Sequence, residues 1–238
     1  MYRYFLAVAL VLGLLPVIAF GGLVNTYPGW NGSDTICCFG YPDTSTYGEA
    51  ITTPAGATDV TSFSFWLQSS GGAGFEFQAF ISAWDNTNYE LTGSMMYMSP
   101  VMTAADSNLD EYIFNVNVPV TPGTIYMFGA TINNPSVYGV DSNIAYSDGA
   151  GMGGDEGSGG NSTYYFAYNN DTGENGPLYA NWNSSANGGC ADNTGVECGQ
   201  AAFLATYSGS AVPEPGSLTL LGSALILLAG IARRRLQR

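Results

Sequence analysis

Apolar and polar residues alternate with a period of two from residue 61 to residue 84, and this pattern constrains the fold more than any other part of the sequence. A period of two is typical of a β-strand with one buried face. Because the glycine-rich segment 69–74 divides the stretch, the sequence predicts two strands, 61–68 and 75–84, joined as a hairpin. The side chains predicted to face inward are Phe63, Phe65, Leu67, Phe75, Phe77, Ala79, Ile81 and Ala83.

Shorter segments of the same kind follow along the chain, and no segment between residues 23 and 211 has a convincing helical period. Short alternating strands with turn signals between them predict an all-β fold, an antiparallel β-sandwich of the jelly-roll type. Residues 25–47, which are rich in Gly, Asn, Asp, Ser and Pro, are expected to form an irregular lead-in. The further predicted strands are 94–99, 111–118 (with Tyr112, Phe114, Val116 and Val118 inward), 124–132, 163–168, 178–182 and 201–207.

The two ends of the chain differ from this body. Residues 1–22 carry one basic residue, Arg3, near the start and continue through the apolar segment 5–20. This pattern indicates a secretory signal peptide and signal helix, cleaved between residues 19 and 22. An uncleaved membrane anchor is the alternative, and both place the body outside the cytoplasm. The predicted organisation is therefore a signal peptide at 1–22, an extracellular β-sandwich domain at 23–211 and a separate segment at 212–238.

The last segment has three parts in a fixed order. The polar motif Val212, Pro213, Glu214, Pro215 is followed by the uncharged apolar run 218–232 and by a basic end, Arg233, Arg234, Arg235 and Arg238. The two prolines favour an extended, accessible backbone. As a helix the apolar run spans about 22 Å, which makes a short transmembrane helix against a hydrocarbon core of about 30 Å. Since arginines beside a membrane segment stay cytoplasmic, everything before Pro213 is expected outside.

The motif, the short helix and the arginine cluster together resemble the PEP-CTERM sorting signal of bacterial surface proteins. The resemblance implies that an exosortase, a membrane transpeptidase-like enzyme, cuts near the motif. It implies a transient stay in the inner membrane of a Gram-negative-type bacterium, followed by transfer to the cell surface or the extracellular polysaccharide matrix. A plain single-span tail anchor is the alternative. Residues 48–133 also resemble a β-sandwich region of other PEP-CTERM proteins, through stretches 48–54, 62–65, 83–85, 111–114 and 121–126.

Charge is distributed unevenly between the body and the ends. All five basic residues lie in the two end segments, the chain has no His and no Lys, and all but one of its 19 acidic residues lie in the body. Such a polyanion repels nucleic acid and anionic lipid, so the body is expected to bind neither. The lack of His and Lys also removes most catalytic schemes, including Ser-His pairs, Schiff-base lysines and His-ligated metals.

A carboxylate-pair glycosidase is the enzymatic alternative that remains. The adjacent acids Asp110-Glu111 and Asp155-Glu156 do not supply its geometry, because neighbours on a strand point to opposite faces. We therefore expect no enzymatic activity. Oxygen ligands for Ca²⁺ could come from Asp148, Asp155 and Glu156 in the glycine-rich stretch 148–161, but a solvated loop is the favoured interpretation, so no cofactor is expected.

Four cysteines in an exported chain predict disulfides. Cys190 and Cys198 enclose a short loop and could pair directly, which leaves the neighbours Cys37 and Cys38. Crossed pairing of 37 and 38 with 190 and 198 is equally reasonable, and the sequence does not decide among the connectivities.

Trp66 and Trp84 lie opposite the predicted inward residues of their strands. If their rings face solvent, they could stack against sugar rings beside Asp and Asn side chains. Burial of both strand faces is the alternative. Together with the sorting signal, these rings predict a surface or matrix protein that associates with extracellular polysaccharide, with a dedicated carbohydrate-binding module as the alternative.

Overall fold

Every regular element in the described part of the computed structural model is a β-strand. The described residues are 22–26, 28–37, 39, 45–69, 75–104, 108–132, 151–155, 164–169, 182–184 and 200–209, all within one compact unit spanning 21–209. That part of the chain contains no helix long and apolar enough to cross a membrane. The predicted signal helix, up to residue 21, and the whole C-terminal segment lie outside the described residues.

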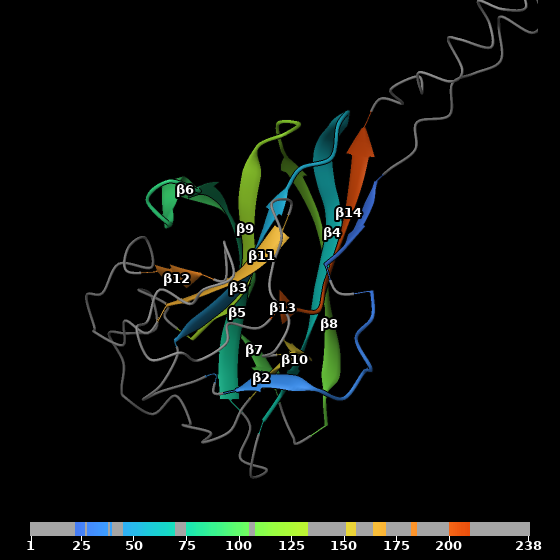
Figure 1. The fold of residues 1–238 in the computed structure, drawn as a ribbon, viewed down its shortest axis with the longest axis vertical. Coiled ribbons are helices and arrows are strands. Elements are labelled where there is room, and N and C mark those ends of the chain that lie inside the picture. The colour runs from blue at the N-terminus through green and yellow to red at the C-terminus, as the bar shows by residue number, and fades with distance from the viewer. Residues whose placement is uncertain are drawn as a thin grey trace, which may run out of the picture. The chain divides into compact units, whose positions relative to one another are not determined.

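The strands form two antiparallel sheets (Figure 1). The first sheet has the order β1-β14-β4-β10-β13, with β8 also paired to β4 and β2 to β10. Its strands are β1 (Leu23–Asn25), β2 (Thr35–Cys37), β4 (Ala57–Gln68), β8 (Asp110–Pro119), β10 (Gly151–Asp155), β13 (Gln200–Ala201) and β14 (Phe203–Gly209).

The second sheet has the order β12-β11-β3-β9-β5-β6, with β7 also paired to β5. Its strands are β3 (Thr46–Thr52), β5 (Phe75–Asp85), β6 (Glu90–Met98), β7 (Met102–Ala104), β9 (Ile125–Thr131), β11 (Tyr164–Asn169) and β12 (Trp182–Ser184). The all-β, antiparallel class predicted from the sequence is confirmed for the described residues, and two such sheets are consistent with a β-sandwich.

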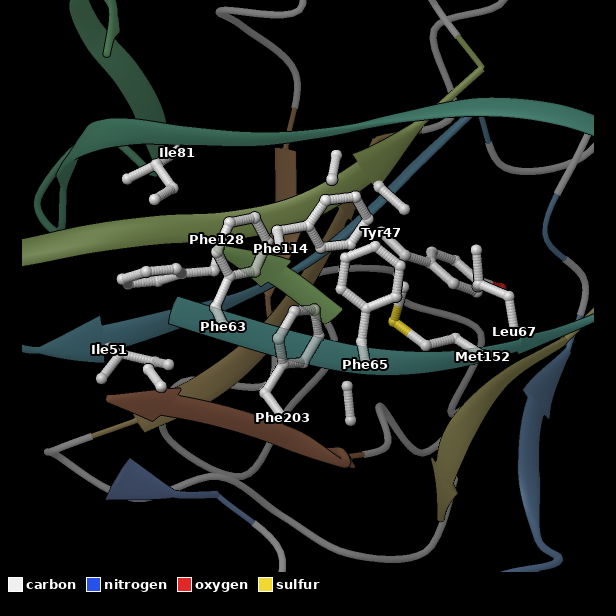
Figure 2. Packing of buried hydrophobic residues seen from close by; sticks show 14 of the residues in the cluster. Tyr47, Ile51, Phe63, Phe65, Leu67, Ile81, Phe114, Phe128, Met152 and Phe203 are labelled. Atoms are coloured by element: carbon white, nitrogen blue, oxygen red, sulfur yellow. The ribbon is translucent and has the colours of Figure 1, made fainter. Parts of the chain in front are cut away.

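Aromatic rings fill the space between the two sheets (Figure 2). Phe63 on β4 packs against Phe128 on β9 with ring centroids 5.6 Å apart, and Phe65 packs against Phe77 of β5 at 6.0 Å. Phe63 also stacks on Phe114 of β8 at 4.9 Å. The inward positions predicted for 61–68, 75–81 and 111–118 are confirmed, because period-two side chains on one face of each strand are buried or packed on this core.

The predicted hairpin between 61–68 and 75–84 is wrong. β4 pairs with β14, β8 and β10 in the first sheet, whereas β5 pairs with β9, β6 and β7 in the second. Two strands that each have one fully apolar face can bury those faces by lying opposite one another across a core. The Phe65 and Phe77 contact shows that arrangement, with β4 in the first sheet and β5 in the second.

Five of the observed strands were not predicted: β1, β2, β3, β7 and β10. The prediction of an irregular lead-in at 25–47 is therefore wrong for β2 and for the start of β3, where backbone pairing with distant strands overrides the turn-rich local composition.

β3 lies in the middle of the second sheet, between β11 and β9, yet Glu49 and Gly48 interrupt its apolar alternation. β10 lies in the glycine-rich stretch for which a solvated loop was favoured, and that interpretation is wrong for residues 151–155. Met152 is fully buried in the core, and a Cβ atom on Gly154 would lie 2.4 Å from the Gln200 carbonyl oxygen, so glycine permits the close pairing with β13.

The face of the second sheet that points away from the core carries buried side chains too. A second cluster of buried apolar side chains lies there, made of Ala50, Phe80, Trp84, Leu91, Met127, Tyr165, Ala167 and Trp182. Phe80 pairs across the strands with Gly129, and a Cβ atom at that glycine would lie 2.7 Å from the Phe80 ring. The ring therefore lies over the glycine, which is a recurrent way to fill a glycine position in a sheet.

Candidate functional site

The outer face of the first sheet is the best candidate for a binding surface among the described residues. Its side chains alternate along β4, β8 and β14 with the buried phenylalanines of the core. Cross-strand pairing arranges them in three rows. We call this set the outer face, and its rows are Trp66 and Glu111; Leu204, Ser64 and Ile113; and Thr206, Ser62 and Asn115.

Trp66 is half-buried on this face, and a second tryptophan packs against it. The ring centroids of Trp66 and Trp30 are 5.0 Å apart, with an interplanar angle of 57°. Trp30 is half-buried as well, and its indole N–H donates to the carbonyl oxygen of Asp34 at 2.9 Å. The tryptophan pair forms one end of the outer face.

The loop that carries Trp30 is held by a local hydrogen-bond network. The side-chain oxygen of Asn31 accepts from the backbone N–H groups of Ser33 and Asp34, both at 2.9 Å. An Asn side chain that bonds the backbone two residues on fixes a turn without a regular element. This loop was expected to be part of an irregular lead-in, and no sequence spacing links Trp30 to a strand more than thirty residues later, so sequence reasoning missed it.

Glu111 is the acidic member of the outer face. It is exposed on β8 directly opposite Trp66, and its Oε1 accepts a hydrogen bond from the Ser64 hydroxyl at 2.8 Å. Ser64 itself is only 4% exposed, so the anchor of this carboxylate is rigid. Within the described residues Oε2 has no further hydrogen bond, which leaves it able to accept one from a ligand.

Apolar side chains continue from the tryptophan pair across the sheet. Ile113 on β8 is 60% exposed, Leu204 on β14 is half-buried beside Ser64, and Leu23 on the edge strand β1 is 66% exposed opposite Thr206. The next row is polar, with hydroxyls and an amide. The outer face therefore combines aromatic and aliphatic contact area with hydrogen-bonding groups, which is the chemistry by which proteins bind neutral polar ligands such as sugars.

Trp84 does not belong to any such surface, so the prediction that its ring faces solvent is wrong. It is 6% exposed in the second cluster, where its ring lies 5.4 Å from that of Trp182 at 81°. Its indole N–H donates to the Tyr165 hydroxyl, which donates to the Asn86 side-chain oxygen. Burial raises the pKa of Tyr165 to about 12. Both faces of β5 are buried here, which was the stated alternative.

Glu49 is a buried acid in the core. It occupies an inward position of β3 between Tyr47 and Ile51 and is 0% exposed. Its Oε2 accepts from the Ala201 N–H of the first sheet at 3.3 Å, whereas Oε1 and the amide nitrogen of Gln200 have no hydrogen-bond partner among the described residues. Burial raises the pKa of Glu49 well above its usual range and outweighs the opposing effect of the hydrogen bond from the Ala201 N–H. Burial thus favours the uncharged form of this acid more than exposure to solvent would.

The other predicted site residues are described only in part. Asp155 and Cys37 have a described backbone, in β10 and β2, and these strands pair with Gly151 opposite Cys37. Within the described part of the chain no three His, Cys, Asp or Glu side chains are grouped to hold a metal ion. Outside the described residues lie Asp148, Glu156, Cys38, Cys190, Cys198, the motif Val212, Pro213, Glu214, Pro215, and Arg233, Arg234, Arg235 and Arg238.

No protein-family model, no curated protein and no solved structure matches this chain. Its candidate site therefore stands on the chemistry of its own residues.

Proposed function

We propose that this chain is an exported, non-enzymatic β-sandwich protein of jelly-roll type that works at the cell surface or in the extracellular matrix. The apolar segment 5–20 behind Arg3 and the apolar run 218–232 before the arginine cluster, which predict a signal peptide and a transmembrane helix, support export through the inner membrane. The order of polar motif, apolar run and arginine cluster supports processing by an exosortase-type enzyme as the first partner of the chain. The absence of basic side chains between residues 4 and 232 supports a function that does not involve binding nucleic acid.

The body associates with extracellular polysaccharide through the outer face. One observation carries this proposal: the half-buried pair Trp66 and Trp30 lies beside an anchored carboxylate, Glu111, on a sheet face that is accessible in part. Tryptophan rings stack on the apolar faces of sugar rings, and carboxylate oxygens accept hydrogen bonds from sugar hydroxyls. Trp66 packs against Trp30 and Glu111 accepts a hydrogen bond from Ser64 without a ligand, so less side-chain freedom is lost on binding.

Replacing Trp66 with alanine is expected to weaken binding to the extracellular polysaccharide of the exporting cells by at least about tenfold, the size typical of a central aromatic contact. Trp30→Ala is expected to have a similar effect, because its ring supports that of Trp66. Affinity electrophoresis or calorimetry, run with Ca²⁺ and with chelator, measures the change. Val101→Ala is the matched control, because it removes exposed apolar surface in the described part of the chain outside the outer face.

Unchanged affinity in both tryptophan variants would contradict sugar stacking. Binding that chelator abolishes, but that the tryptophan changes leave intact, would indicate cation bridging between two acidic partners instead. Release of reducing ends from any polysaccharide would contradict the non-enzymatic proposal.

Protein extracted from the cell surface is expected to lack both end segments. Cleavage at residues 19–22 and near Pro213 removes every basic side chain, since all five lie outside residues 23–211. Intact-mass measurement of the extracted protein checks this and reports the disulfides at the same time. A mass that still includes Arg233 to Arg238 would leave the C-terminal segment as a plain membrane anchor.

A further inference from the structure

Glu111 lies where it can act on the charge of a bound polysaccharide. Residues directly opposite each other in antiparallel strands have Cβ atoms about 4.5–5.5 Å apart, so the Glu111 side chain starts next to that of Trp66. The hydrogen bond from Ser64, at 2.8 Å, holds the carboxylate over β4 on the same side as the ring. A sugar stacked on Trp66 therefore meets this carboxylate.

Nothing in the body can offset the charge of that carboxylate. The chain has no Lys and no His, and its arginines are confined to positions 3, 233, 234, 235 and 238. A uronate or other acidic sugar would bring a second negative charge into the same row, and its carboxylate, unlike the hydroxymethyl group of a neutral sugar, has no proton to donate to Oε2. An uncharged sugar brings hydroxyl donors, and a charge-assisted hydrogen bond is stronger than a neutral one.

We infer that Glu111 is a specificity-determining residue that makes the outer face select uncharged polysaccharide over polysaccharide bearing carboxylates, an inference that rests on the proposed function. Trp66 makes a stacking contact that neutral and carboxylated polysaccharides share, and Glu111 makes the difference in affinity between them. Specificity of this kind combines an attractive contact to one ligand with repulsion of the other.

Glu111→Gln tests this assignment because it removes the charge while leaving a side-chain oxygen for the Ser64 hydroxyl. The full chain and its variants are produced in cells that export them and purified. Binding is measured to a panel of neutral polysaccharides, including hydroxyethylcellulose, xylan and mannan, and to the carboxylated form of each polymer, with chelator present throughout. The matched control is Glu76→Gln, because Glu76 is an exposed acid on β5 of the second sheet and its loss changes the net charge equally.

Wild-type protein is expected to favour the neutral member of each pair that it binds. In Glu111→Gln the ratio of neutral to carboxylated affinity is expected to fall about fivefold, the upper range for one exposed charge interaction. That difference should shrink as salt rises from 0.05 M to 0.5 M, because exposed charges are screened. Glu76→Gln is expected to leave the ratio unchanged.

The failures are distinguishable. If neutral polymers bind through Trp66 but the ratio is the same in wild type and Glu111→Gln, the selectivity assignment is wrong and the proposed function stands. An equal change in Glu76→Gln would also overturn it, because net charge and not position would then be the cause. If wild-type protein binds no member of the panel, the selectivity assignment is contradicted, and the proposed function is contradicted as well only if the extracellular polysaccharide of the exporting cells is not bound either.

Discussion

The free energy of unfolding of the wild-type protein is expected to fall as pH rises because of Glu49, and Glu49→Gln is expected to abolish that contribution. Because burial raises the pKa of Glu49 in the folded state above its ordinary value of 4.5, the folded protein holds this proton more tightly than the unfolded chain does. The stabilising effect is fully present below the unfolded pKa and declines as pH rises towards the folded pKa. One proton gives a slope of about 1.4 kcal/mol per pH unit over that window.

Denaturant unfolding between pH 4 and pH 9 measures the effect as the difference between wild type and variant, which cancels the repulsion among the other acids. The variant is expected to match wild type at the acidic end and to become more stable at the alkaline end. Glu76→Gln is the control, an exposed acid in the same sheet, and its curve should run parallel to that of wild type. Parallel curves for Glu49→Gln would show that the buried carboxyl does not titrate with a raised pKa.

Phe63→Ala is expected to lower the free energy of unfolding by about 3–5 kcal/mol, which is the range for removing a buried phenylalanine. Phe63 is 1% exposed, and its ring contacts those of Tyr97, Phe114 and Phe128. These rings come from both sheets, so the alanine variant would leave a cavity between the sheets, which the surrounding structure fills only in part (Figure 2).

Ile113→Ala provides the comparison for that change. Ile113 lies on β8, beside Phe114, but is 60% exposed on the outer face, so its truncation should alter stability by no more than about 0.5 kcal/mol. Urea unfolding of both variants at one pH gives the two values. Similar losses for both would mean that the outer face is covered in solution, which would also weaken its candidacy as a binding surface.

Period-two patterning predicted the inward faces correctly because it depends only on neighbours along one strand. Phe63, Phe65 and Leu67 are buried, and Phe114 and Val118 are buried on β8. The same reasoning could not say which strands pair. A hairpin between β4 and β5 and a crossing between sheets bury the same side chains, and the choice depends on partners such as β9 and β14 that come later in the chain.

Trp66 and Trp84 show that the local pattern also could not predict which side chains are accessible for binding. The two residues have equivalent positions in the sequence pattern, each on the face opposite the apolar one. Trp66 lies on a sheet face that is accessible in part, whereas Trp84 is covered in the cluster that includes Trp182 and Tyr165. Which outer face is covered depends on residues distant in sequence, so no local pattern could separate the two.

By itself the sequence determined the class of the fold, the inward face of each alternating strand and a body without any basic side chain. Those properties follow from local alternation and from composition. Only the tertiary structure decided the pairing of the strands, the strand at Thr46–Thr52, the burial of Glu49 and the meeting of Trp30, Trp66 and Glu111. The physical reason is that each of these depends on contacts between segments far apart in the chain. Those contacts contribute to stability only once both sheets have formed.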